Sequence, residues 1–252
     1  MTRGVLLYAF NNETINYKKI AEWSSKRIEK YLGLPTTIIS DLTLAKSGGR
    51  RIMHPTVDKQ YSTWYNAARH TAWELSPYDQ TIILDVDYIV SSDQLLKLFD
   101  SSQYFACHQT VVDATGRNQF SAHEKFGELQ FPQTWATVCY FTRDPRTKKI
   151  FDIIKMILEN YSHYANLYKF AKQPFRNDYA FSIALSILSG HRITNDYNIP
   201  WPLLNVSTDV TFNVNEDRIN LNYLKQQRSQ YLSILGQDLH VLNKLCLGEL
   251  VA

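Results

Sequence analysis

Cysteine is scarce in this sequence, which has only three among its 252 residues: Cys107, Cys139 and Cys246. They are far apart along the chain, and none belongs to a CxxC pair. The pattern argues against a zinc knuckle and against a disulfide framework, because both need cysteines at closer or more regular spacing. We therefore expect a protein that works in a reducing compartment.

Long apolar runs are absent as well. The run from Val5 to Phe10 is shorter than the apolar core of a signal peptide, and no later stretch could cross a bilayer. We therefore expect a soluble, cytoplasmic protein that has no membrane partner.

No single sign of charge dominates, since 27 Lys and Arg residues stand against 24 Asp and Glu residues. This balance excludes a strongly acidic or histone-like protein but leaves room for a local basic patch. No linker rich in proline, glycine or serine divides the chain, and apolar residues make up 44% of it. Such a composition can supply the core of one large α/β domain, so we predict a single domain over residues 1–252.

The first hundred residues alternate between strand and helix patterns. Continuous apolar runs at 4–10 (GVLLYAF), 36–40 (TTIIS) and 81–84 (TIIL) are typical of strands that are covered on both faces. Between the first two, residues 16–32 have apolar side chains at helical spacing, and Gly33 is a common helix terminator. This rhythm predicts an α/β fold with a mostly parallel central sheet flanked by helices.

Beyond residue 100 the pattern changes. Strand-like segments at 104–108 and 136–142 are separated by a long polar stretch, and loops of that length in compact domains are usually functional. Residues 205–222 are rich in asparagine and predict irregular structure. Helical spacing predicts helices at 57–75, 146–160, 163–171, 178–189 and 223–235.

The most informative residues are Asp85 and Asp87, which directly follow the strand TIIL and precede the apolar pair Ile89 and Val90. Ligands of open α/β sheets bind beyond the carboxyl ends of the strands. Two carboxylates one residue apart at such an end can share a hard divalent cation, which can bind the two phosphates of a nucleotide. A bare Asp-x-Asp is common and often only caps a helix, but the flanking apolar residues hold this pair beside the core.

Four features stand out along the chain: a first strand followed by Asn11-Asn12, a second strand ending in Asp41, the sequence YDQTIILDVDYIV at 78–90, and His240-x-x-x-Lys244. Together they resemble the nucleotide-sugar glycosyltransferases of the GT-A fold, and the glycogenin-like branch is the closest in character. The resemblance covers most of the chain and is strongest over residues 4–90. One departure is that the glycogenin-like pattern has a glycine and a longer His-to-Lys spacing that ends in Lys-Pro-Trp, where this chain has HVLNKLCL.

The resemblance implies a role for each matching position. Asp85 and Asp87 would form the DxD motif, with Asp87 as a direct ligand of Mn²⁺ or Mg²⁺ and Asp85 reaching the donor ribose or the metal. His240 would be the third metal ligand, and Lys244 would lie on the diphosphate of a nucleotide sugar, for which a UDP-sugar is expected. Base and ribose would be held around Tyr8, Ala9, Phe10, Asn11 and Asp41.

The same resemblance divides the predicted domain into two functional parts. Residues 1–100 would form the nucleotide-binding half. Residues 101–252 would form the acceptor side together with the segment that binds metal and diphosphate.

His240 and Asp178 also have simpler explanations. A single histidine is more often a satisfied structural residue than a ligand, and Asp178, at the start of a helix after Pro174, could be an N-cap. In GT-A enzymes a carboxylate at this point contacts the acceptor or donor sugar, or acts as a general base. If the sugar is transferred with inversion, Asp178 would take the proton of the acceptor hydroxyl, which is a poor nucleophile by itself.

Basic and aromatic side chains alternate over residues 169–181, where Lys169, Lys172 and Arg176 lie. Such a run is usually a solvated helix face, although it also suits a surface that follows phosphates beside an acceptor. Arg51, in the basic loop expected at 47–51, is a further candidate for cofactor binding. The small size is reminiscent of bacteriophage enzymes that glycosylate hydroxymethylated DNA bases, in which case modified DNA in the host cytoplasm would be the acceptor.

Two other hypotheses remain open. The sequence LDVDYIV also resembles the nucleophile strand of haloacid-dehalogenase-type phosphatases, but that strand normally comes first in the fold, and no later Lys and Asp-Asp motif follows. The other alternative is a non-catalytic module that binds a sugar, a nucleotide or nucleic acid. The leading hypothesis is a metal-dependent hexosyl- or pentosyltransferase that moves a sugar from a nucleotide diphosphate donor to an acceptor hydroxyl.

Overall fold

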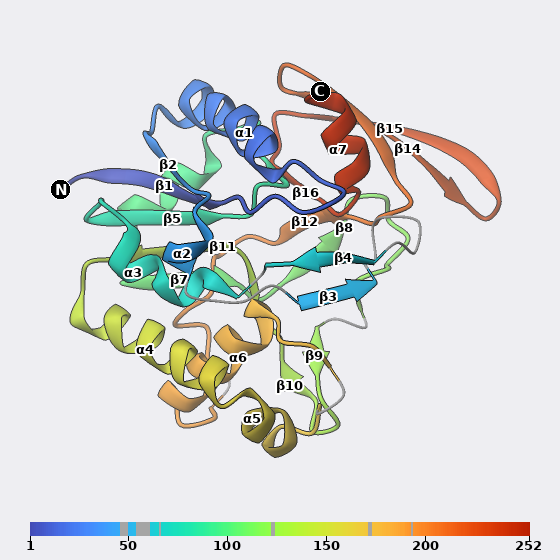
Figure 1. The fold of residues 1–252 in the computed structure, drawn as a ribbon. Coiled ribbons are helices and arrows are strands. Elements are labelled where there is room, and N and C mark those ends of the chain that lie inside the picture. Colours follow the sequence, from blue (N-terminus) through green and yellow to red (C-terminus); the bar gives the residue numbers. More distant parts are fainter. Residues whose placement is uncertain (46–49, 54–60, 66, 122–123, 171–172, 193) are drawn as a thin grey trace.

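The computed structural model describes residues 1–45, 50–53, 61–65, 67–121, 124–170, 173–192 and 194–252, with the backbone alone at residues 44, 45 and 50–53. Its centre is a five-stranded sheet with the strand order β2-β1-β5-β11-β7 (Figure 1). β11 is antiparallel to both of its neighbours, so four of the five strands run in one direction. The strands are β1 (Arg3–Tyr8), β2 (Thr36–Ile39), β5 (Gln80–Leu84), β7 (Phe105–His108) and β11 (Trp135–Thr142).

Both faces of this sheet are buried because side chains alternate between two apolar clusters. Val5 and Leu7 pack with the apolar stripe of α1 (Tyr17–Leu32) on one face. Leu6 lies on the other face, in the cluster that includes α4 (Pro145–Glu159) and α6 (Asn177–Leu188). The chain is thus an α/β protein with the mostly parallel, helix-flanked sheet that the sequence predicts.

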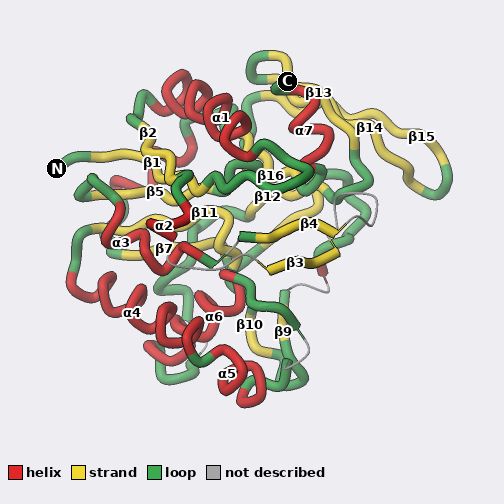
Figure 2. The backbone as a smooth tube through the Cα atoms, viewed as in Figure 1, coloured by secondary structure: helices red, strands yellow, loops and turns green. Residues whose placement is uncertain are grey.

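A second sheet begins where β5 ends. Its strand order is β6-β16-β12-β8, and only a short turn separates β5 from β6. Figure 2 shows two of its strands, β12 and β16. β16 pairs antiparallel with β6 and parallel with β12. The strands are β6 (Tyr88–Ile89), β8 (Val111–Asp113), β12 (Leu203–Val206) and β16 (Leu239–Val241), and α7 (Lys244–Leu250) follows β16 and contacts α1.

A third, antiparallel sheet carries a long hairpin that extends away from the rest of the molecule (Figure 1). It consists of β13 (Thr211–Asn215), β14 (Arg218–Lys225) and β15 (Arg228–Leu235). None of the helices among the described residues is long and apolar enough to cross a membrane. The remaining elements are α2 (Leu42–Ala45), β3 (Arg50–Met53), β4 (Tyr61–Trp64), the 3₁₀ helices η1 (Ala68–Thr71) and η2 (Gln94–Asp100), α3 (Ala72–Leu75), β9 (Lys125–Phe126), β10 (Phe131–Pro132) and α5 (Tyr161–Leu167).

The predicted helices at 16–32, 146–160 and 178–189 are present as α1, α4 and α6, but the helix predicted at 223–235 is wrong. That segment belongs to β14 and β15, whose inward side chains alternate, with Ile219 and Ile234 both buried in the core. Gln226 and Gln227 join the two strands with positive φ angles of 51° and 61°. Asparagine and glycine usually fill such a turn, so two glutamines gave no hairpin signal.

Two further expectations need correction. Residues 205–222, expected to be irregular, contain most of the ordered strands β13 and β14. The helix predicted at 57–75 is replaced by β4, η1 and α3 in its described part, because short apolar runs do not distinguish a strand from a helix. Arg50 and Arg51, expected in a loop, lie in β3.

The packing at Gly4 gives a stability prediction. A Cβ atom at this position in β1 would lie 2.3–2.5 Å from ring carbons of Tyr78, whose hydroxyl group hydrogen-bonds Thr37 at 2.8 Å. We expect Gly4→Ala to lower the free energy of unfolding by about 1–3 kcal/mol, because the ring must move within a packed core. Urea unfolding measures the change.

Gly248→Ala is the matched control. Gly248 lies in α7, and an added Cβ would meet no atom within 4 Å. Because alanine favours a helix over glycine, this variant should be more stable by about 0.5–1 kcal/mol. Equal stability of Gly4→Ala and the unchanged protein would contradict the described packing.

Candidate functional site

The turn that carries Asp85 and Asp87 is fixed through its backbone. The amide of Asp85 donates to the carbonyl of Thr137 in β11 at 2.9 Å, and the amide of Val241 in β16 donates to the carbonyl of Asp87 at 3.0 Å. Within the turn, the amide of Tyr88 donates to the carbonyl of Asp85 at 3.0 Å. The two carboxylates are therefore attached to the central sheet on one side and to the second sheet on the other.

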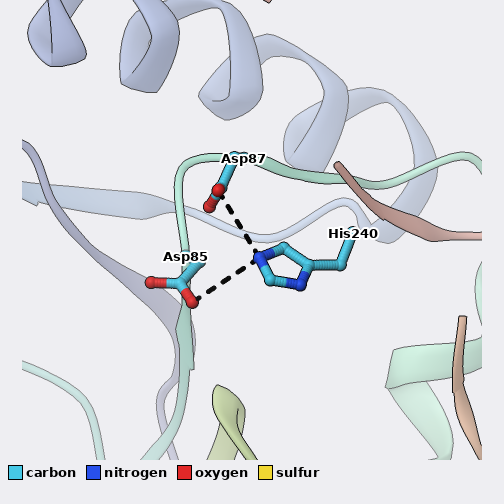
Figure 3. Close-up of side chains that lie close together, drawn as sticks. All are labelled: Asp85, Asp87 and His240. Carbon is cyan, nitrogen blue, oxygen red and sulfur yellow. Dashed lines mark ion pairs between the residues drawn. The ribbon is translucent and has the colours of Figure 1, made fainter. Parts of the chain in front are cut away.

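His240 reaches the two carboxylates through β16, where it lies opposite Tyr88 in β6. Figure 3 shows its imidazole ring with one nitrogen facing both aspartates. Nε2 lies 3.5 Å from Oδ2 of Asp87 and 3.9 Å from Oδ2 of Asp85. Nδ1 lies 3.0 Å from Oδ1 of Asn205, on the neighbouring strand β12.

These three side chains form a possible metal-binding triad. One ligand atom from each lies within 4.8 Å of the others. Ligands at about 2.1 Å from a common ion are separated by about 3–4 Å, so only small side-chain movements are needed. Two carboxylate oxygens and one imidazole nitrogen leave further coordination positions open, and carboxylate-rich sets suit hard divalent ions such as Mn²⁺ or Mg²⁺.

Each aspartate of the triad is also paired with a cation. Arg69 of η1, whose side chain is almost fully buried, forms an ion pair with Asp85, and Lys244 at the start of α7 forms one with Asp87. Burial alone would raise the pKa of Asp87, but Lys244 and His240 outweigh it and hold that pKa far below its ordinary value. Burial raises the pKa of Asp85, although the guanidinium of Arg69 opposes this effect.

Asp178 lies in the first turn of α6 and is held from two directions. Its Oδ1 accepts a hydrogen bond from the amide of Ala136 in β11 at 2.9 Å. Its Oδ2 accepts hydrogen bonds from Nη2 and Nε of Arg176 at 2.7 and 3.1 Å. The side chain therefore joins α6 to β11 and does not cap its own helix.

A cavity of about 380 Å³ joins the triad and Asp178. Charged side chains of both signs occupy its floor, and aromatic rings form much of its wall. Burial raises the pKa of Tyr17 in this wall to about 12, so its phenol stays protonated at neutral pH. The aromatic lining residues are Tyr8, Phe10, Tyr17, Trp64, Tyr65, Phe120 and Trp135, and the charged ones include Arg69, Lys244 and Arg176.

The structure brings seven of the predicted site residues to this cavity. They are Tyr8, Phe10, Asp85, Asp87, Asp178, His240 and Lys244.

Four predicted residues are absent from the described cavity lining. Ala9 is buried in the core. Oδ1 of Asn11 accepts from the amide of Lys18, and Oδ1 of Asp41 accepts from the amide of Thr43, so both side chains satisfy local turns. The side chain of Arg51 lies outside the described residues. The ligand-binding roles of these four residues stay predictions.

Sequence reasoning missed several lining residues, above all Arg69 and Tyr17. Neither belongs to a recognisable motif, because each reaches the cavity from an element whose position depends on the whole fold. Trp64, within the segment 57–75 that the sequence predicts as a helix, lines the cavity from β4. In the basic and aromatic stretch 169–181, Phe170 and Tyr179 are buried and pack against Phe126.

No protein-family model and no curated protein matches the chain. Among solved structures, the chain is similar to the galactosyltransferase LgtC, determined with donor and acceptor sugar analogues. The sequence identity is 14%, the similarity covers 71% of this chain and 70% of LgtC, and the TM-score is 0.44.

Two other solved structures are also glycosyltransferases. The glycosyltransferase GlyE of Streptococcus pneumoniae is 16% identical over 79% of this chain and 45% of its own, with a TM-score of 0.40. Mouse xyloside xylosyltransferase 1 is 10% identical over 76% of this chain and 83% of its own, also with a TM-score of 0.40. Identities this low concern the fold alone, and TM-scores below 0.5 add no support to any particular activity.

His108 gives a pH prediction for the region behind the site. It is the last residue of β7, is fully buried, and its Nδ1 lies 3.0 Å from the carbonyl oxygen of Trp201. Burial lowers the pKa of His108 to about 4. Between this value and the ordinary value of about 6.5, the unfolded chain binds a proton that the folded chain does not, so stability falls as pH falls through this window.

We expect this residue to account for a loss of about 2 kcal/mol between pH 7 and pH 5. In urea unfolding, His108→Gln should reduce the pH dependence by that amount. His163→Gln, at an exposed histidine of α5, is the control and should leave the dependence unchanged. An unaltered pH dependence in His108→Gln would show that His108 does not titrate as described.

Proposed function

We propose that this protein is a metal-dependent glycosyltransferase that moves a sugar from a nucleotide diphosphate sugar to an acceptor hydroxyl. The observation that carries the proposal is the grouping of Asp85, Asp87 and His240 at the floor of a cavity of about 380 Å³, with Lys244 beside them. This grouping combines ligands for a hard divalent ion with a cation for a diphosphate.

The charges of the floor suit the departure of a diphosphate. A divalent ion held by the triad would neutralise negative charge on the leaving group, so that no proton is needed there. Burial would lower the pKa of Lys244, but Asp87 raises it well above the ordinary value, so the ammonium stays charged. Arg69 holds the carboxylate of Asp85 from behind and fixes its direction.

The aromatic wall gives the donor a place to bind. Tyr8 and Phe10 lie at the carboxyl end of β1 and line the cavity together with Tyr65. Flat aromatic faces suit a nucleotide base or the apolar face of a sugar ring, and a cavity of this volume accommodates a ligand of that size. We assign the base and ribose of the donor, which we propose to be a UDP-sugar, to this side.

We assign Asp178 to positioning the transferred sugar or the acceptor. Both of its oxygens already accept hydrogen bonds from Ala136 and Arg176. A carboxylate held in this way is oriented firmly and keeps free lone pairs that can accept a hydrogen bond from a sugar hydroxyl.

We propose a sugar hydroxyl as the acceptor, with a hydroxymethylated DNA base as the second candidate. In the basic and aromatic stretch 169–181, Phe170 and Tyr179 pack in the core and are not exposed for contact with nucleic acid. Arg176 pairs with Asp178 and does not extend a phosphate-binding surface. Parallel assays on glycans and on hydroxymethylated DNA decide between the two acceptors.

The phosphatase hypothesis receives less support from the site. The nucleophilic aspartate of that family normally follows the first strand of the fold, whereas Asp85 follows β5. Hydrolysis of simple phosphate esters without a preference for nucleotides would favour the phosphatase. The absence of any turnover combined with Mn²⁺-dependent nucleotide binding would favour a non-catalytic module.

Asp87→Asn tests the proposed metal site. The variant keeps the shape of the side chain but removes the charge that a divalent ion requires, so we expect Mn²⁺-dependent hydrolysis of a UDP-sugar to fall at least about 100-fold. Isothermal titration of UDP in the presence and absence of Mn²⁺ gives a second measurement. Asp152→Asn, at an exposed aspartate of α4 paired with Lys148, is the control. Turnover in Asp87→Asn at the level of the unchanged protein would exclude the metal role.

Lys244→Met tests the proposed diphosphate contact. Removing the ammonium should weaken UDP binding by about 10-fold or more in the presence of saturating Mn²⁺, because a charge-assisted contact to the diphosphate is lost. Uridine, which has no phosphate, should bind both proteins equally. A loss of affinity for uridine as large as that for UDP would contradict the assignment.

A further inference from the structure

Asn205 is a polar residue in the middle of an apolar strand. It lies in β12, a strand whose residues Leu203 and Val206 are apolar and buried. Asn205 is itself completely buried. The register places it directly beside His240 on β16. Neighbouring residues of parallel strands point to the same face of a sheet, so the two side chains lie next to each other.

The contact between these side chains favours one tautomer of the imidazole. Oδ1 of Asn205 lies 3.0 Å from Nδ1 of His240. A carbonyl oxygen can only accept a hydrogen bond, so this contact favours the tautomer with the proton on Nδ1 and a lone pair on Nε2. Nε2 is the nitrogen that faces Asp85 and Asp87.

The other end of the same amide has no partner. Nδ2 of Asn205 is buried and makes no hydrogen bond to any described residue. An unsatisfied buried donor lowers stability, so packing alone would favour an apolar side chain of similar size at this position. The amide oxygen is therefore the feature that explains an asparagine here.

An amide also suits the charge of its surroundings. The triad already places two carboxylates within 4 Å of Nε2 of His240. An aspartate at position 205 would orient the ring equally well but would add a third buried negative charge. Asparagine orients the ring without that charge.

We propose that Asn205 is a positioning residue of the metal site, which holds His240 in the tautomer that directs the Nε2 lone pair at the ion. This inference rests on the proposed metal site of Asp85, Asp87 and His240. Without the amide oxygen, the proton would move to Nε2, where the two carboxylates would accept it, and metal binding would then have to displace that proton.

The first test is the tautomer of His240 in the metal-free protein. Long-range ¹H–¹⁵N correlation spectra separate the two neutral tautomers, and His240→Gln identifies the signals by their loss. We expect the proton on Nδ1 in the unchanged protein and a shift to Nε2 in Asn205→Leu. Asn205→Asp keeps an acceptor oxygen and should keep the proton on Nδ1. A proton on Nε2 in the unchanged protein would overturn the proposal without any variant at position 205.

The second test is the affinity for Mn²⁺, measured by titration calorimetry without substrate. We expect Asn205→Leu to bind Mn²⁺ about 10- to 100-fold more weakly and Asn205→Asp to stay within about threefold of the unchanged protein. Asn222→Leu makes the same change at an exposed residue of β14 and should not alter the affinity. Thermal unfolding of all variants separates loss of metal binding from loss of folding.

The outcomes distinguish this inference from the function on which it rests. If the unchanged protein binds no Mn²⁺, the proposed function and the inference both fail. If the unchanged protein binds Mn²⁺ and a folded Asn205→Leu binds it equally well with the proton still on Nδ1, only the role of Asn205 is overturned.

Discussion

Neutralisation of buried carboxylates is the constraint on which this site depends. Asp85 and Asp87 follow a strand with no exposed residue, and their mutual repulsion would not be tolerated there without nearby cations. Arg69 and Lys244 provide that compensation from η1 and α7, two elements on either side of the turn. In the proposed function, the same carboxylates and cations that stabilise the turn would also bind the divalent ion and the diphosphate, so folding and binding would use one set of electrostatic contacts.

Each of the two sheets positions a different part of the site. The central sheet positions Asp85 through β5 and β11, while the second sheet delivers His240 through β16. The junction between them is only as long as the turn itself, so a small change in its backbone would move both carboxylates relative to the imidazole. The backbone hydrogen bonds to Thr137 and Val241 limit such movement from both sides.

The sequence predicts the strands and site residues whose signal lies in neighbouring residues. It misses the site residues that only the fold brings together from distant segments. The run TIIL predicted a buried strand, and its end predicted where Asp85 and Asp87 lie, because a continuous apolar run admits few other positions in an α/β fold. His240 and Lys244 were placed by resemblance, and both are found beside the aspartates. Arg69 and Asn205 carry no local signal, since only the register of folded elements brings them to the site. The β14–β15 hairpin was not predicted, because its Gln226-Gln227 turn lacks the asparagine and glycine that usually mark such a turn. The division of the chain into two functional halves stays a prediction.

The pairing of Lys244 with Asp87 joins residues 157 positions apart, and this separation has a consequence for how the protein matures. Closing so long a loop costs entropy that only late tertiary contacts repay, so partly folded chains would contain the aspartate pair without its histidine or its lysine. If the proposed metal site binds a divalent ion, such intermediates would hold it more weakly than the completed fold. Metal affinity would then report the last stage of folding, and bound metal would in turn draw the population toward the native state by mass action.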